Sequence, residues 1–310
     1  MAPARQSQWV GAASPEAPVI VFLHEGLGSV AMWRDFPEHL CRSLGCRGLV
    51  YSRPGYGRST PRAPAERWQP DFMHREAHEV LPALFKVLGV DTLSDPPWLL
   101  GHSDGGSIAL LYASRFVTRL QGVIALAPHI KVEPISVASI ERVREVYRSG
   151  DLRARLARFH DDPDSAFWGW NDAWLNPAFL QWSIESDLGS IRCPVLAVQG
   201  LDDEYGTLEQ IRGIAREVPQ AQLLELAGCG HSPHRDQREL LRLEEADEVV
   251  SMDLERAGAS IRGQGTGGEQ IAPVARDVEA VWGGRRVGVE DQRVRDEAWG
   301  GRGKAHMQGQ

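Results

Sequence analysis

The residue types with the clearest chemical potential are a serine, a carboxylate and a histidine, widely separated along the chain. Ser103 lies in Gly-His-Ser-Asp-Gly (101–105), between an apolar run ending at Leu100 and another beginning at Ile108. This pattern predicts a strand, a sharp turn and a helix, with the serine at the apex. The glycines let the helix pass close to the strand. The positive N-terminus of that helix favours negative charge developing at the serine.

The other two residue types follow later apolar runs, in an order that suits a serine nucleophile. The run 194–200 is followed by a loop with the carboxylates Asp202, Asp203 and Glu204, and the run 222–226 leads to His231. An imidazole can accept the serine proton and return it to a leaving group, while a carboxylate fixes the imidazole tautomer. The order Ser, Asp, His therefore predicts a catalytic triad at the carboxyl ends of strands, with Ser103 as its nucleophile.

Neighbouring residues leave alternatives open for two of these roles. Asp202 could replace Asp203 as the acid, and His234 could replace His231 as the base. We favour His231 because it directly follows a Gly-Cys-Gly turn. His102, beside the serine, is expected to pack inside the fold, since its side chain points away from the apex.

Strand and helix patterns alternate along most of the chain, which predicts an α/β fold with a mostly parallel central sheet flanked by helices. The alternation stops after Pro128 and resumes at Pro194. We therefore predict a core formed by 8–130 and 193–256, with a helical cap over 131–192. Catalytic residues then belong at the carboxyl ends of the strands. The glycine-rich and arginine-rich segment 257–310 has no apolar periodicity, and this composition predicts a disordered tail.

The predicted cap is dense in tryptophan, including Trp168, Trp170 and Trp174. Aromatic residues at this density usually pack a cap onto a core. One or two of these three could instead line an apolar substrate pocket above Ser103.

Composition excludes several classes of protein. The 310 residues are 42% hydrophobic, enough for one α/β domain with a large insertion, and the net charge of −8 argues against a nucleic-acid partner. The ten histidines and four cysteines show no ligand spacing, so no metal and no cofactor are expected. No signal-peptide core or membrane-length apolar run stands out, and reduced thiols are the simplest interpretation, so we expect a cytoplasmic protein. The oligomeric state stays open.

Two further loops extend the pattern to a family resemblance. His24 follows an apolar strand and leads into Glu-Gly-Leu-Gly (25–28), and the turn Arg-Pro-Gly-Tyr-Gly-Arg-Ser (53–59) follows another strand. With the serine turn and its partners, residues 8–240 resemble the α/β-hydrolase superfamily. The sequence Ser-Asp-Gly-Gly from Ser103 is similar to that of valacyclovir-hydrolase-type esterases.

This resemblance implies an α/β-hydrolase fold with a cap and an oxyanion hole formed by backbone amides. Those amides would belong to Gly26 and Asp104, and the acid would be Asp203, three residues after the strand's closing glycine. Glu25 stands where the family usually has glycine, which makes the backbone geometry of this loop a point to examine.

Together these features predict a serine hydrolase that cleaves a small carboxylic ester through an acyl-enzyme. Alternatives on the same triad are C–C bond hydrolysis of a ring-cleavage product and acyl transfer; a non-catalytic ligand-binding member of the fold is another. Glu25 and Asp104, near the serine, could pair with an ammonium group of the substrate. In the alternative interpretation, Asp104 caps its helix or forms an ion pair within the fold, and Glu25 faces solvent.

Overall fold

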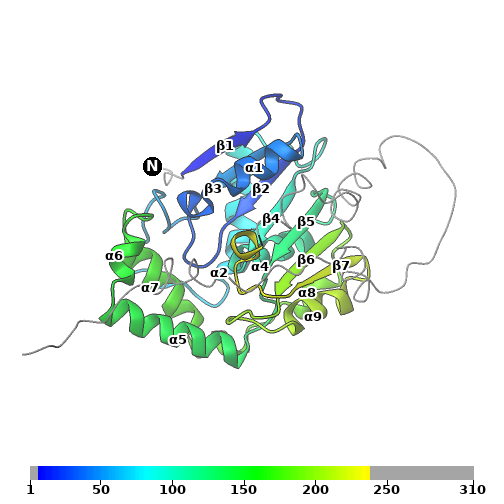
Figure 1. Cartoon of the computed structure of the whole chain (residues 1–310). Helices are drawn as coiled ribbons and strands as arrows, with labels where there is room; N and C mark the ends of the chain where they lie inside the picture. The colour runs from blue at the N-terminus through cyan, green and yellow to red at the C-terminus, as the bar shows by residue number, and fades with distance from the viewer. Residues whose placement is uncertain (1–5, 238–310) are drawn as a thin grey trace, which may run out of the picture. The chain divides into compact units, whose positions relative to one another are not determined.

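The computed structural model describes residues 6–237. Within them, seven strands form one sheet in the order β1-β3-β2-β4-β5-β6-β7 (Figure 1). Strand β1 is antiparallel to β3, and all other neighbours are parallel. The strands are β1 (Ser7–Gly11), β2 (Val19–Leu23), β3 (Arg47–Tyr51), β4 (Trp98–His102), β5 (Gly122–Leu126), β6 (Val195–Gly200) and β7 (Ala221–Leu226). The predicted α/β class with a mostly parallel sheet is confirmed.

The helical elements alternate with the strands, as βαβ connections require. They are η1 (Val30–Trp33), α1 (Phe36–Ser43), α2 (Phe72–Arg75), η2 (Glu76–Val80), α3 (Leu81–Leu88), α4 (Asp104–Arg115), α5 (Pro134–Ser149), α6 (Leu152–Leu156), α7 (Pro163–Trp174), η3 (Phe179–Gln181), α8 (Glu185–Leu188), α9 (Glu209–Glu217) and α10 (Pro233–Asp236).

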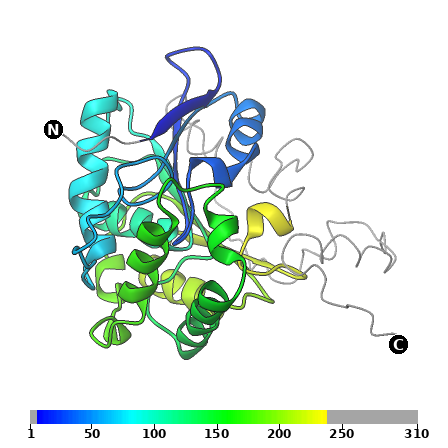
Figure 2. The ribbon, with the colours of Figure 1, turned by 90° about the vertical axis from the view of Figure 1, so that its left-hand side faces the viewer.

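The central strands are apolar on both faces because helices cover both. All five residues of β2 are buried. Val21 faces a cluster that includes residues of α3, α4 and α9, while Phe22 faces a second cluster that includes residues of η1 and α1. Figure 2 shows the blue helix α1 and the cyan segment α2–α3 on opposite sides of the sheet. Side chains that alternate along a strand thus build two separate cores.

The interval between β5 and β6 holds α5 to α8 and η3, and these helices lie within 131–192, the segment predicted to be the cap. Helices α5, α6 and α7 group together beside the sheet (Figure 1). Helix α7 begins where Asp162 accepts a hydrogen bond from the Ser165 amide at 2.8 Å, with Pro163 in the first turn. The predicted closing helix beyond 238 and the tail 257–310 lie outside the described residues.

Six parallel strands, β2 to β7, end at the same edge of the sheet, and five of them are followed by a residue already singled out in the sequence or its loops. Arg53 follows β3 and Ser103 follows β4. Gly26, Asp203 and His231 lie in the loops after β2, β6 and β7. Because the carboxyl ends of parallel strands share one edge, the fold brings distant parts of the sequence together there.

Candidate active site

The turn that carries Ser103 is strained and tightly packed. Ser103 has φ 54° and ψ −120°, a left-handed conformation that non-glycine residues rarely adopt. A side-chain carbon on Gly101 would lie 2.1 Å from the Gly105 carbonyl oxygen, and one on Gly105 would lie 2.0 Å from the Leu23 carbonyl oxygen. Only glycine fits at both positions, so helix α4 can start directly against β4 and β2.

Ser103, His231 and Asp203 form one chain of hydrogen bonds. The distance between Ser103 Oγ and His231 Nε2 is 2.9 Å, and His231 Nδ1 lies 2.9 Å from both carboxylate oxygens of Asp203. Since a carboxylate only accepts, Nδ1 carries the proton and Nε2 is left to accept from the serine hydroxyl. This tautomer is the one that a general base requires.

Asp203 is buried and held in place by three other groups. Its carboxylate accepts hydrogen bonds from the amides of Tyr205 (2.8 Å) and Gly206 (3.2 Å), and from Gln199 Nε2 (2.6 Å). Burial raises the pKa of Asp203, but His231 and the Tyr205 amide outweigh it and hold that pKa below its usual value. The neighbouring Asp202 is exposed. The structure therefore brings Asp203 to the histidine.

His231 lies in a mixed electrostatic environment. Burial lowers the pKa of His231, but Asp203 and then Glu204 and Glu25 raise it, with a net increase above the ordinary value. The ring of His102 donates from Nε2 to the His231 carbonyl at 2.7 Å. His102 is buried, as expected, and it also fixes the backbone of the loop that carries His231.

His234, the alternative base, lies in the apolar core. Its ring centroid is 5.0 Å from that of Trp33 and 5.4 Å from that of Phe36. Neither of its ring nitrogens has a hydrogen-bond partner among the described residues. Burial lowers the pKa of His234 well below its ordinary value, so the ring is neutral.

The two amides expected to hold an oxyanion are available. Within residues 6–237, neither the Gly26 nor the Asp104 N–H donates to another residue. Asp104 is the first residue of α4, where helix amides lack an internal partner. Glu25 does not require left-handed backbone. Its carboxylate lies over Gly28, where an added side-chain carbon would come within 2.4 Å of Glu25 Oε2.

Both carboxylates that could have met a cationic substrate have cationic partners inside the fold. Asp104 Oδ1 accepts from Trp174 Nε1 at 3.1 Å, and Oδ2 lies 3.7 Å from Arg53 Nη2. Burial raises the pKa of Asp104. Glu25 lies 3.6 Å from Arg235 Nη2. The contacts of Asp104 match the alternative in which it forms an ion pair within the fold. The expectation that Glu25 faces solvent is wrong, because its side chain is 16% exposed and lies beside Arg235.

Two of the three tryptophans singled out in α7 reach the site. Trp170 and Trp174 are one turn apart on α7. A side-chain carbon on Gly26 would lie 2.1 Å from Trp170 Nε1, so that indole covers the glycine, while Trp174 donates to Asp104. Helix α7 thus places one indole against each expected oxyanion residue.

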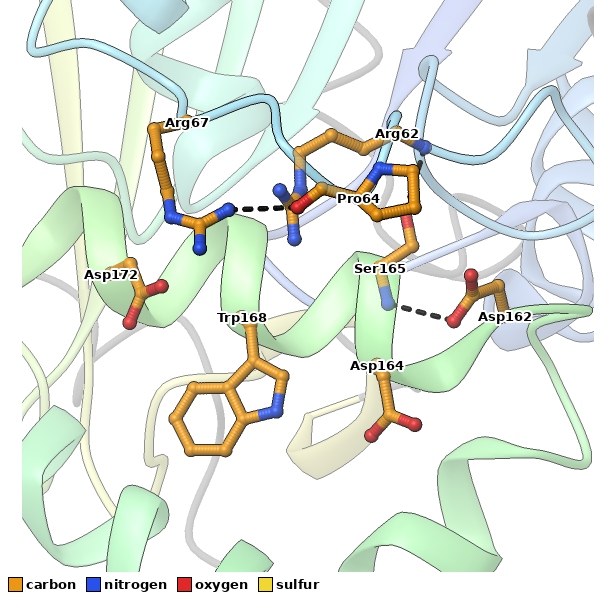
Figure 3. A pocket seen from close by; sticks show the side chains of 8 residues that line it. All are labelled: Arg62, Pro64, Arg67, Asp162, Asp164, Ser165, Trp168 and Asp172. Atoms are coloured by element: carbon orange, nitrogen blue, oxygen red, sulfur yellow. Dashed lines mark hydrogen bonds between the residues drawn. The ribbon is translucent and has the colours of Figure 1, made fainter.

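Trp168, also on α7, faces a different region. It lines a pocket of about 370 Å³ whose walls do not include Ser103. Figure 3 shows the indole below Arg62 and Arg67, with Asp164 and Asp172 on either side. The structure therefore does not bring Trp168 to Ser103 through this pocket.

Sequence reasoning missed His129, the third residue after β5. Its ring centroid is 5.6 Å from that of His231 and 4.9 Å from that of Trp174. Burial lowers the pKa of His129 to about 3, so the ring stays neutral beside His231. A polar residue just after a buried strand, at the edge where Ser103 also lies, was the available signal.

No three His, Cys, Asp or Glu side chains within residues 6–237 gather as a metal-binding group. In the same part of the chain, no helix combines the length and apolar character needed to cross a membrane.

Comparison with protein families settles the wider relationship. The family model described as alpha/beta hydrolase fold matches residues 18–186, more than half of the chain. The chain belongs to the alpha/beta hydrolase fold family. This α/β hydrolase is 23% identical over 243 residues to 2-hydroxy-6-oxo-6-phenylhexa-2,4-dienoate hydrolase of Burkholderia cepacia, covering 70% of the chain and 82% of that protein.

Solved structures show the same fold at lower identity. A thermophilic esterase from Thermogutta terrifontis matches with a TM-score of 0.61 at 19% identity, over 82% of this α/β hydrolase and 94% of the esterase. The enol-lactonase of Burkholderia xenovorans LB400 matches with a TM-score of 0.60 at 19% identity, over 77% and 94% of the two chains.

Proposed function

We propose that this α/β hydrolase cleaves a small carboxylic ester through a serine acyl-enzyme. The observation that carries the proposal is the chain of 2.9 Å contacts from Ser103 through His231 to Asp203. Beside it lie the amides of Gly26 and Asp104, whose N–H groups donate to no other described residue. A serine needs a base to attack at neutral pH, and the tetrahedral product of attack needs donors for its oxyanion. Both requirements are met within one site.

In the first half-reaction, Ser103 Oγ forms a bond to the ester carbonyl carbon as its proton passes to His231 Nε2. The carbonyl oxygen becomes an oxyanion and accepts from the Gly26 and Asp104 amides. Asp203 stabilises the imidazolium and stays ionised. Collapse breaks the bond to the leaving alkoxide, which takes the proton from His231 and departs as an alcohol.

In the second half-reaction, water attacks the acyl-enzyme carbonyl and gives a proton to His231 Nε2. A second oxyanion forms at the same amides. Its collapse breaks the bond to Ser103 Oγ, which recovers the proton from His231, and a carboxylic acid leaves. The two half-reactions need only these residues, the ester and water, and no cofactor.

A neutral ester suits the site better than a cationic one. Asp104 and Glu25 each face a cationic side chain of the fold. An ammonium group would have to compete with Arg53 and Arg235 for those carboxylates.

The four cysteines are free thiols, which fits the expected cytoplasmic location.

Hydrolysis of a carbon–carbon bond in a ring-cleavage product is the second candidate. The Burkholderia cepacia relative is named for a dienoate hydrolase, and it shares 23% identity over most of its length. The same serine, histidine and aspartate would serve that reaction. Turnover of a vinylogous 1,5-diketone, with no burst from simple esters, would favour this candidate.

The decisive experiment measures p-nitrophenyl ester hydrolysis across acyl lengths, with labelling by a fluorophosphonate probe. Wild type should show a burst of p-nitrophenol and label once. Ser103→Ala should abolish labelling and lower kcat by about 10⁴-fold or more. Ser114→Ala, on the same helix α4, should behave as wild type. Full labelling of the Ser103→Ala variant would reject the nucleophile.

A further inference from the structure

The peptide group between Glu25 and Gly26 is held by an unusual number of donors. Its carbonyl oxygen accepts from Arg53 Nη2 at 2.8 Å, from His24 Nδ1 at 2.7 Å and from the Gly28 amide at 3.1 Å. The N–H of the same peptide is the Gly26 donor of the proposed oxyanion hole. In a planar trans peptide the carbonyl and the N–H point in opposite directions. Fixing the oxygen therefore aims the N–H.

The tautomer of His24 follows from the same contacts. His24 Nε2 accepts from the Arg53 amide at 3.0 Å, so the proton of the neutral ring is on Nδ1, which donates to the Glu25 carbonyl. Burial, and then Arg53, lowers the pKa of His24 well below its ordinary value. One residue, Arg53, thus supports this peptide through both its backbone and its guanidinium.

The guanidinium of Arg53 is a charged group buried away from solvent. The residue is 1% exposed, its guanidinium carbon lies 4.6 Å from the Tyr56 ring centre, and Nη2 is 3.7 Å from Asp104 Oδ2. A hydrogen bond from a charged donor is stronger than a neutral one, and in a low-dielectric site it polarises the next bond along the chain. The Gly26 N–H therefore becomes a better donor to a developing oxyanion.

We propose that Arg53 is a positioning residue that aims and polarises the Gly26 amide toward the oxyanion. The inference rests on the proposed serine-hydrolase function. A competing role for Arg53 is to neutralise Asp104, whose carboxylate adjoins the second oxyanion amide. The two roles differ in what happens when the Asp104 charge is removed as well.

The test compares Arg53→Met and Arg53→Lys with wild type, using Arg58→Met as the control from the exposed part of the same turn. Losing one oxyanion donor costs about 10²- to 10³-fold in kcat. Because the Gly26 N–H is misaimed rather than deleted, we expect Arg53→Met to lower kcat by about 100-fold with KM within about threefold. Arg53→Lys, which keeps the charge, should recover about tenfold, and Arg58→Met should match wild type.

The double variant Arg53→Met, Asp104→Asn separates the two roles and avoids leaving a buried carboxylate unpaired. If Arg53 acts through the Glu25 carbonyl, the double variant stays within about threefold of Arg53→Met. Recovery to near the wild-type kcat would overturn the proposal in favour of charge neutralisation. A rise in KM as large as the fall in kcat, in both variants, would also overturn it.

A binding measurement checks the same point without turnover. A trifluoromethyl ketone adds to the serine and forms a stable oxyanion, so its affinity should fall in Arg53→Met by the same factor as kcat. The methyl ketone of equal size, bound as a substrate mimic, should keep its affinity. If wild type neither hydrolyses esters nor binds the trifluoromethyl ketone, the serine-hydrolase function itself fails. If wild type does both and Arg53→Met is unchanged, only the role of Arg53 fails.

Discussion

The protonation of one ring, His231, links the geometry of the site to pH. A general base works in its neutral form, so activity is lost as pH falls through its pKa. The net effect of Asp203 and burial raises the pKa of His231 above its ordinary 6.5. Activity is therefore expected to be lost, as the pH falls, at a higher pH than the ordinary pKa of an imidazole would give.

Replacing Asp203 by Asn tests this dependence. The wild-type kcat/KM should decrease as the pH falls, with a midpoint above pH 6.5. Asp203→Asn should lower that midpoint, because the carboxylate charge that stabilises protonated His231 is gone. In the Ser-His-Asp template the same change lowers kcat by about 10⁴-fold. Asp202→Asn, at the exposed neighbour, is the matched control and should leave both quantities unchanged. A midpoint that is the same in Asp203→Asn and wild type would contradict this role.

Helix α7 contacts both residues of the proposed oxyanion hole through the spacing of its indoles. Trp170 and Trp174 emerge from one face of the helix because residues four apart lie on the same side. One covers Gly26 and the other donates to Asp104. The position of α7 and the shape of the proposed oxyanion hole are therefore coupled.

Adding one methyl group at Gly26 should reveal this coupling. The new carbon would lie 2.1 Å from Trp170 Nε1, so either α7 or the loop must move. Overpacking costs about 1–3 kcal/mol, which corresponds to about 5- to 150-fold in kcat/KM if borne by the active state. Adding Trp170→Ala to Gly26→Ala should restore at least about tenfold, whereas Gly189→Ala, which meets open space, should have no effect. No recovery in the double variant would mean that α7 does not restrain this loop.

Across the molecule, several histidines are buried in the neutral form. Burial lowers the pKa values of His24, His129, His160 and His234 below the ordinary 6.5. His160 accepts from the Gly57 amide at 2.9 Å and donates to the Leu27 carbonyl at 2.9 Å, so it joins the cap interval to two core loops. Protonating this ring would remove the acceptor.

Stability should therefore fall steeply in mild acid. For these residues the folded pKa lies below the unfolded value, so their contribution is complete above about pH 6.5 and is lost as pH falls. Each full proton of difference changes the free energy of unfolding by about 1.4 kcal/mol per pH unit. We expect urea titrations from pH 8 to 5 to show that the free energy of unfolding decreases with pH by an amount that corresponds to more than one proton bound on unfolding. A pH-independent midpoint would contradict this prediction.

His234→Leu isolates one member of this set. The ring packs against Trp33, Phe36 and His102 and has no hydrogen bond among the described residues, so leucine removes a proton-binding site without leaving a partner unpaired. In this variant, the number of protons taken up on unfolding in mild acid should decrease by up to one. His39→Leu, at an exposed position, is the control.

What the amino-acid sequence by itself determined were the local and ordered features. Apolar runs ending in glycine located the strands that end before Ser103 and Asp203, because strand periodicity and tight turns are encoded by adjacent residues. The order Ser, Asp, His indicated a triad, because parallel strands deliver their carboxyl ends to one edge. The fold class followed from the same alternation of elements.

Only the tertiary structure decided which neighbouring residues meet. Asp202 and Asp203 are equally acidic in the sequence, but the turn after β6 buries one and exposes the other. Asp104 and Glu25 resembled substrate contacts until Arg53 and Arg235, from other loops, were seen beside them. Such pairings depend on how distant elements pack and on which charges lose water together, and neither is encoded in local periodicity.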